Sequence, residues 1–269
     1  MSTDQPESFY RAVSDGVYAS TVATRGPWDE NAQHAGPPAA LLGHAIEHRA
    51  GARSDMRVAR IAFTIARPVP IAPVQVTTTV VRSGRGTEVV EASLAVVGDD
   101  GASGPAVMRA EAVLIRVAPD SAPEFTAPLS VPPPDDVPET LTRFRFDVGY
   151  HTSMETRYAI GSFMESGPAT VWFRMRCPLV AGRPIDPLSR VLTAADSGNG
   201  VSQVLDIRRH LFVNADLTVH LHRYPTTEWV CLDAVTYIDK GGIGLADTAL
   251  YDVDGPIGRG SQSLFVLPR

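Results

Sequence analysis

A single carboxylate lies in otherwise apolar company in the second half of the chain. Asp196 follows the apolar run 192–195 and precedes the small residues 197–200. A carboxylate at such a position is costly to bury unless it has polar partners or a chemical role. The alternative is an exposed aspartate near a Gly-rich helix end, and the rest of the sequence has to decide between the two.

The second half of the chain repeats the first. At a constant shift of 156 residues, the matched pairs are Arg67 with Arg223, Gly86 with Gly242, Glu91 with Asp247, and Leu94 with Leu250. A register kept across several segments favours an internal duplication.

This duplication allows matched positions to be compared within one chain. Asp196 falls opposite Ala40, Asn214 opposite Val58 and, at a smaller shift in the last strand, Gln262 opposite Glu111. The second half therefore carries a carboxylate and two amides where the first has two apolar residues and a glutamate. A helix, the entry to a meander strand and the last strand can converge, which makes the three side chains a candidate site. The alternative is that Asn214 caps a turn and Gln262 faces solvent.

Two helices and two antiparallel meanders are predicted to position these residues. One helix covers 35–48, with Pro37 and Pro38 in its first turn, and the other covers 187–196, with Asp186 as its cap. Strand-like runs separated by short turns indicate the meanders. The runs are 58–67, 74–82, 87–97 and 106–117, then 215–223, 228–238, 244–251 and 257–267, with further strands at 16–23, 144–158 and 169–177.

A helix followed by such a meander is typical of the hot-dog arrangement, so the predicted fold class is α+β, a double hot-dog. Seven prolines between Pro119 and Pro138 exclude a core strand or helix and predict an extended linker. The predicted division is a repeat at 1–118, a linker at 119–143 and a second repeat at 144–269. The helices would pack on one continuous sheet or on two back-to-back sheets. Two unrelated α+β domains are the alternative, which the repeat disfavours.

Composition excludes several classes of function. A net charge of −6 and a pI near 5.6 argue against nucleic-acid binding, and no apolar run is long enough for membrane insertion. Without a signal peptide, a cytoplasmic location is expected. The two cysteines do not form a disulfide framework, and neither a metal nor another cofactor is expected. His220 and His222 alternate on one strand face without a third ligand, which favours a structural or surface role.

Common catalytic signatures are missing. The sequence has no Gly-x-Ser-x-Gly, no Gly-x-Gly-x-x-Gly that opens a helix after a strand, and no phosphate-binding loop.

Several short motifs carry a resemblance to a known family. They are Ala-Ala-Asp at 194–196, Asn-Ala-Asp-Leu-Thr-Val-His-Leu-His-Arg at 214–223, Glu-Trp at 228–229, Ser-Gln at 261–262, and Ala-Gly-Pro-Pro-Ala-Ala-Leu-Leu at 35–42. Over nearly the whole chain, this pattern resembles the acyl-CoA thioesterase II family of double hot-dog acyl-CoA hydrolases. The resemblance implies an acyl-CoA substrate.

The resemblance also implies roles for particular residues. In that family an Asp, a Thr and a Gln hold and activate the hydrolytic water, and these roles fall on Asp196, Asn214 and Gln262. Asn214 departs from the family pattern, which has a hydroxyl there. A base at Asp196 and water-positioning amides would let water attack the thioester directly. The expected substrate contacts are His34, Gly36 and Arg223, with backbone N–H groups near Gly36 at the oxyanion.

Arg67 or Arg223 is expected to meet the nucleotide phosphates, and the acyl chain to lie in an apolar groove between the repeats. A homo-oligomer is expected because hot-dog sheets commonly bury edges and outer faces against copies. A non-catalytic acyl-CoA or lipid binder is one alternative, kept open by Asn214. An enoyl-CoA hydratase is another, although Val201 occupies the position five residues after Asp196 where that family carries His.

Overall fold

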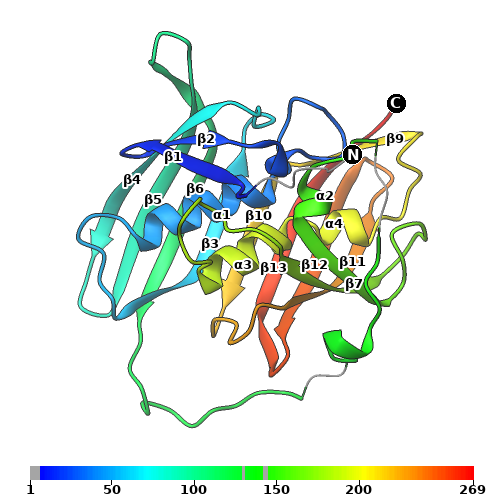
Figure 1. Ribbon diagram of the computed structural model, residues 1–269. Coiled ribbons are helices and arrows are strands. Elements are labelled where there is room, and N and C mark those ends of the chain that lie inside the picture. Colours follow the sequence, from blue (N-terminus) through cyan, green and yellow to red (C-terminus); the bar gives the residue numbers. More distant parts are fainter. Residues whose placement is uncertain (1–6, 129–130, 142–144) are drawn as a thin grey trace.

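The computed structural model describes residues 7–128, 131–141 and 145–269. Within these ranges the strands form one continuous 13-stranded sheet, and the two longest helices, α1 and α3, lie together near its middle (Figure 1). Of the two predicted arrangements, the structure therefore has the single continuous sheet and not the back-to-back pair of sheets. None of the helices in this part of the chain is long and apolar enough to cross a membrane.

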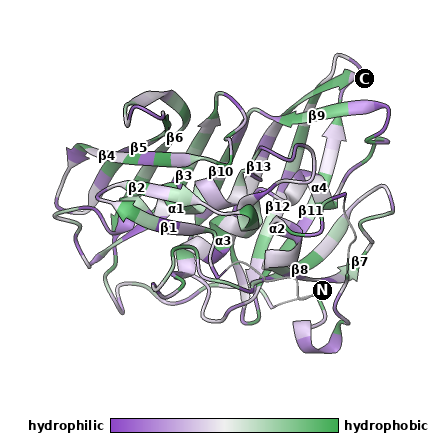
Figure 2. Cartoon of the chain, turned by 45° about the horizontal axis from the view of Figure 1, so that its top comes forward, coloured by the Kyte–Doolittle hydropathy of each residue, from purple (hydrophilic) through white to green (hydrophobic). Residues whose placement is uncertain are grey.

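The first half contributes six strands and one α-helix. They are β1 (Tyr10–Ser14), β2 (Val17–Ser20), α1 (Gly36–Glu47), β3 (Met56–Ile65), β4 (Pro73–Ser83), β5 (Thr87–Val97) and β6 (Ser103–Arg116), with the 3₁₀ turn η1 (Val22–Thr24). Buried and exposed residues alternate along β5, and Figure 2 shows apolar and polar stretches mixed along the strands. This alternation is expected of a sheet with one face against the core.

The second half repeats this order with additions. Its elements are η2 (Pro134–Asp136), α2 (Tyr150–Ser153), β7 (Met154–Ile160), β8 (Ala169–Met175), α3 (Pro187–Ala195), α4 (Gly198–Val201), β9 (His210–Asn214), β10 (Asp216–Leu221), β11 (Val230–Ile238), β12 (Ile243–Asp252) and β13 (Gly255–Pro268). Both predicted helices and both predicted meanders are present, and none of their ends moves by more than three residues.

Four local predictions need correction. The predicted strand at 16–23 is β2 followed by the turn η1. Of the predicted strand at 144–158, residue 144 lies outside the described residues, 145–149 form bends, and α2 precedes β7. The elements α4 and β9 were not predicted. Asp186 occupies the cap position of α3 but makes no capping hydrogen bond, because its carboxylate instead meets His44 and His48.

The duplication is visible in the pairing of the two central strands. In the β3–β10 ladder Ala62 faces Thr218, Ile61 faces Val219 and Phe63 faces Leu217. At the shift of 156 residues, Ala62 corresponds to its own partner, and the pair Ile61–Val219 corresponds to the pair Leu217–Phe63. The two strands therefore exchange places under the repeat, and the ladder lies on the approximate twofold axis between the repeats.

The same ladders correct one matched pair. Glu91 pairs with Glu111 in the first repeat, and its counterpart Asp247 pairs with Ser261 in the second. The residue that corresponds to Gln262 is therefore Ala112, not Glu111. Ala112 and Gln262 are both buried, so the second repeat has an amide where the first has a methyl group.

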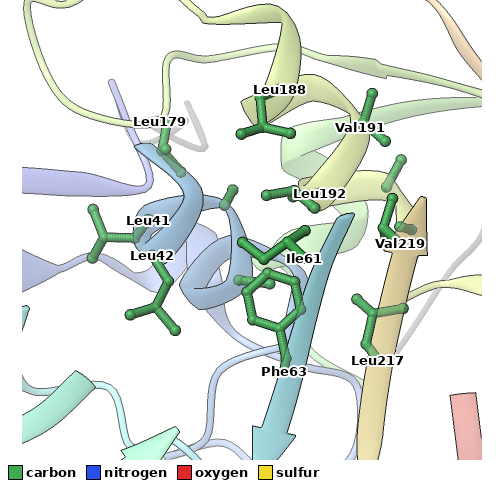
Figure 3. Close-up of a cluster of buried hydrophobic side chains, with 14 of the residues drawn as sticks. Leu41, Leu42, Ile61, Phe63, Leu179, Leu188, Val191, Leu192, Leu217 and Val219 are labelled. Carbon is green, nitrogen blue, oxygen red and sulfur yellow. The ribbon is translucent and has the colours of Figure 1, made fainter. Parts of the chain in front are cut away.

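The two long helices approach each other through glycines. A Cβ atom at Gly36 would lie 2.2 Å from the carbonyl oxygen of Thr193, and one at Gly43 would lie 2.4 Å from Cδ1 of Leu192. Figure 3 shows the apolar cluster between the helices and the central strands, including Leu192, Ile61 and Phe63. The contact brings the first residues of α1 next to the last turn of α3.

The Pro-rich segment runs outside the sheet, as expected of a linker (Figure 1). Its described part contains no strand and only the short turn η2. The indole Nε1 of Trp172 donates to the carbonyl oxygen of Pro132 at 2.9 Å, which ties the segment to β8.

Candidate active site

Asp196 lies directly after the last residue of α3, where the first turn of α1 meets that helix. Its side chain is buried, with an exposed fraction of 5%. Asn214 Nδ2 donates to Oδ1 of Asp196 at 2.9 Å, and Gln262 Nε2 donates to the same oxygen at 3.2 Å. His34 Nδ1 lies 3.1 Å from the other oxygen, Oδ2. With Gly36 in the first turn of α1, the structure thus brings together five of the six predicted site residues, and Arg223 is the exception.

The first turn of α1 also faces Asp196. The backbone N–H groups of Ala35 and Gly36 favour its charged form, and the Gly36 N–H donates to Nδ1 of His34 at 3.1 Å. N–H groups at a helix start have no partners within the helix and favour a negative charge. Gly36 therefore contacts His34 and Asp196 and does not itself line the neighbouring cavity.

Gln262 is held on all sides by protein atoms. Its Nε2 donates to both the carbonyl oxygen and the carboxylate of Asp196, and its Oε1 accepts from the backbone N–H of Asn199 at 3.0 Å. Both Nε2 hydrogens are used, and the side chain lies outside the cavity wall. Gln262 therefore lies behind Asp196 as seen from the cavity.

Asn199 completes the network and was not predicted. Its Nδ2 donates to Oδ1 of Asn214 at 3.3 Å. The Oδ1 of Asn199 is buried and has no partner among the described residues. The only sequence signal is that Asn199 lies between two glycines, three residues after Asp196. The glycine on one side is required, since a Cβ at Gly198 would lie 2.5 Å from Thr248 Oγ1.

Burial shifts the pKa values of the central pair in opposite directions. The pKa of Asp196 is raised, because burial penalises the carboxylate more than His34, Asn214 and the α1 N–H groups favour it. The pKa of His34 is lowered, because burial outweighs the attraction of Asp196. A raised carboxylate pKa is the direction expected of a proton acceptor, because it makes the carboxylate a stronger base.

Tyr150 fixes the orientation of His34. The two rings stack with centroids 3.8 Å apart and an interplanar angle of 5°. The Tyr150 hydroxyl donates to the carbonyl oxygen of Thr193 at 2.9 Å, and it lies 2.9 Å from Ser197 Oγ. Burial raises the pKa of Tyr150, so its hydroxyl stays protonated.

A cavity of about 350 Å³ opens beside this network. Asp196, Asn214, Asn199 and His34 line one part of its wall. The rest is mostly apolar and comes from both halves of the chain, including Trp28, Ile65, Met154, Tyr158, Phe163, Phe173, Ile207, Leu211 and Phe212. A small polar cluster in an apolar cavity of this size is typical of a small-molecule site.

Arg223 is not brought to this cavity. Its guanidinium forms a two-point ion pair with Asp252, with bonds of 2.6 and 2.5 Å, and it donates to the carbonyl oxygens of Pro256 and Gly255. These partners use its donors and hold the β12–β13 hairpin, so Arg223 lies apart from the other predicted site residues. Arg67 is exposed and precedes Pro68 of the cavity wall. His220 and His222 are exposed, in agreement with a surface role.

Comparison with known proteins assigns the chain to a family. Residues 24–117 match the model of the acyl-CoA thioesterase N-terminal domain, and residues 119–266 match that of the acyl-CoA thioesterase C-terminal domain. No curated protein matches the sequence.

Solved structures show the same fold along nearly the whole chain. A candidate thioesterase II from Thermobifida fusca is 16% identical with a TM-score of 0.74, covering 97% of this chain and 96% of that one. A hot-dog protein of unknown function from Alicyclobacillus acidocaldarius is 17% identical with a TM-score of 0.74, covering 98% and 97%. An acyl-CoA thioesterase II from Mycobacterium marinum is 14% identical with a TM-score of 0.66, covering 97% and 94%.

At these identities the structural likeness establishes the fold, and the domain models establish the family. Together they confirm the predicted double hot-dog and the predicted resemblance. The chain belongs to the acyl-CoA thioesterase II family.

Proposed function

We propose that this protein hydrolyses the thioester of an acyl-CoA to a free acid and CoA, with Asp196 as the general base. The observation that carries the proposal is the buried Asp196 carboxylate, which is oriented by three side chains at the wall of an apolar cavity. Such a carboxylate is poised to accept a proton from a water beside a bound thioester. The family assignment supports the same reaction.

In the proposed reaction, water attacks the thioester carbonyl carbon while Asp196 takes one of its protons. The C–S bond then breaks, and the CoA thiolate leaves and takes up a proton. No covalent intermediate with the enzyme is needed. Asn214 has a second Nδ2 hydrogen beyond the one given to Asp196, and this hydrogen is available to hold the water.

Gln262 and Asn199 act behind these groups. Gln262 fixes both the backbone and the side chain of Asp196, while Asn199 fixes Asn214 through its Oδ1. An amide at position 214 therefore does what a hydroxyl does elsewhere in the family only because Asn199 holds it in place. Residues so constrained lose little mobility during the reaction.

The oxyanion requires a donor other than Gly36. Gly200 lies in the short helix α4 and lines the cavity wall. We assign its backbone N–H as the donor to the developing oxyanion, since the free Nδ2 hydrogen of Asn214 holds the water.

The substrate class follows from the cavity. Its aromatic and aliphatic wall suits an apolar acyl group, and an acyl-CoA is the proposed partner. The same proposal includes a cytoplasmic location, a role in lipid metabolism and a homo-oligomeric assembly. It also includes the division of the chain into two repeats and a linker, at 1–118, 144–269 and 119–143.

The test is thiol release from a panel of straight-chain, branched and aromatic acyl-CoAs. The expected result is saturable release of one thiol per acid formed, with a preference among acyl groups. Tight acyl-CoA binding without release for any member would support the non-catalytic binder. Addition of water to an enoyl-CoA without thiol release would support the hydratase.

A further inference from the structure

A second polar cluster lies at the opposite end of α1 from the candidate active site. His44 lies on α1, His48 directly follows the last residue of this helix, and Asp186 precedes α3. His44 Nδ1 lies 2.6 Å from Asp186 Oδ2, and His48 Nε2 lies 3.2 Å from Asp186 Oδ1. One imidazole pair from the first repeat thus meets a carboxylate from the second.

The donor atoms of this cluster suit a metal ion. Each of the three residues offers one ligand atom, and the three atoms lie within 4.8 Å of one another. Among the described residues this is the only group of three or more His, Cys, Asp or Glu side chains so arranged. A spacing of four residues places both histidines on one helix face. Two imidazoles and one carboxylate form a ligand set that Zn²⁺ and related transition-metal ions use in proteins.

We propose that His44, His48 and Asp186 form a binding site for one divalent transition-metal ion, with Zn²⁺ the expected ion. The ion binds Nδ1 of His44, Nε2 of His48 and the Asp186 carboxylate, and water completes its coordination. His44 is buried with an exposed fraction of 4%, whereas the His48 side chain is 48% exposed. The buried ligand gives the site a fixed position, and the exposed one leaves a path for the ion to enter.

Arg183 disfavours metal binding at this site. Its NH1 lies 3.3 Å from Nε2 of His44. An arginine N–H can only donate, so it favours the tautomer of His44 with the proton on Nδ1, the ligand atom. Metal binding at Nδ1 displaces this proton, so the neutral imidazole carries its proton on Nε2 instead. Two N–H donors would then face each other, and the exposed Arg183 has to turn away. Arg183→Ala should therefore strengthen metal binding.

The ion would join the two repeats. Two of its ligands come from α1 and one from the start of α3, so binding requires the folded contact between these helices. A ligand that binds only the folded state raises its stability. At an ion concentration 100 times Kd, the expected rise in Tm is roughly 5 °C. The site is separate from Asp196, and the inference does not depend on the proposed hydrolase activity.

The test is titration of the tag-free, metal-stripped full chain with Zn²⁺ by calorimetry, and with Co²⁺ by visible absorption. The expected result is one ion per chain and a Co²⁺ spectrum that Zn²⁺ displaces. His48→Ala and Asp186→Asn should each weaken Kd by at least about 100-fold. Arg183→Ala should tighten it. The double variant His220→Ala, His222→Ala is the matched control, because it removes an exposed histidine pair elsewhere, and it should bind unchanged.

Three results would overturn the inference. One is the absence of saturable binding in the folded wild-type chain. Another is binding that persists unchanged in His48→Ala, an exposed position whose variant should fold. The third is loss of binding in the His220 and His222 control. Because Asp186→Asn could disturb the start of α3, its circular dichroism and Tm without metal are compared with those of the wild type.

Discussion

Asn214 donates a 2.9 Å hydrogen bond from Nδ2 to Oδ1 of Asp196, and its own Oδ1 accepts from Asn199. This chain of two amides ends on a buried carboxylate whose other oxygen faces His34. The arrangement explains how an amide can occupy a position where the family has a hydroxyl. It also predicts which substitutions there preserve activity.

Asn214→Ala should lower kcat/KM by about 10- to 100-fold, because a hydrogen bond to a charged group is lost. Asn214→Thr introduces the hydroxyl of the family pattern and should stay within about tenfold of the wild type, since a hydroxyl can both donate and accept. Steady-state kinetics with the preferred acyl-CoA measures both. Full activity in Asn214→Ala would show that Asn214 does not take part.

Gln262→Met should reduce kcat more than it changes KM. The variant leaves the Asp196 carbonyl oxygen and the Asn199 N–H buried without their partner, at a cost of about 1–3 kcal/mol in the free energy of unfolding. Urea unfolding and steady-state kinetics measure the two effects. A large rise in KM with unchanged kcat would instead indicate that Gln262 contacts the substrate.

Gly36→Ala should destabilise the fold by several kcal/mol. The added Cβ would lie 2.2 Å from a backbone oxygen of α3, which cannot move aside as a flexible side chain can. Gly86→Ala is the matched control, because a Cβ there meets nothing within 4 Å and should change stability by about 0.5 kcal/mol or less. Urea unfolding compares the two. Equal stability would contradict the close α1–α3 contact.

The pH dependence of kcat/KM should show an acidic limb displaced upward from the ordinary pKa of an aspartate. Burial raises the pKa of Asp196, and below that pKa the protonated carboxyl cannot accept a proton from water. His34 partly offsets the rise, so His34→Phe, which keeps a ring to stack on Tyr150, should move the limb to still higher pH. A limb that moves to lower pH would show that His34 does not stabilise the carboxylate.

Much of the fold could be predicted because local signals agree with the tertiary structure. Prolines in the first turns and alternating β-rich runs identify both helices and both meanders. The segment 198–201 was missed because Gly and Asn are poor helix formers. Its helix depends on packing, since a side chain at Gly198 would collide with Thr248 and come within 3.0 Å of Gln262.

The candidate site was predicted in part. Asp196, Asn214 and Gln262 were identifiable because the duplication supplies an internal comparison. The function of Gly36 was not, because the direction of its N–H depends on how α1 meets α3. The sequence did not show that Arg223 lies away from the cavity, because its partner Asp252 comes from a hairpin 29 residues away. The position of Asn199 depends on two partners from other strands, Asn214 at the end of β9 and Gln262 in the middle of β13.

The most direct test of the account is single-turnover hydrolysis by Asp196→Asn, compared with the wild type at saturating enzyme. The substitution keeps the shape of the side chain and removes the basic oxygen. The rate of thioester cleavage should fall by about 10²- to 10⁴-fold, the usual contribution of a general base, while acyl-CoA binding and Tm are retained. A folded Asp196→Asn variant that cleaves the thioester at the wild-type rate would contradict the central claim.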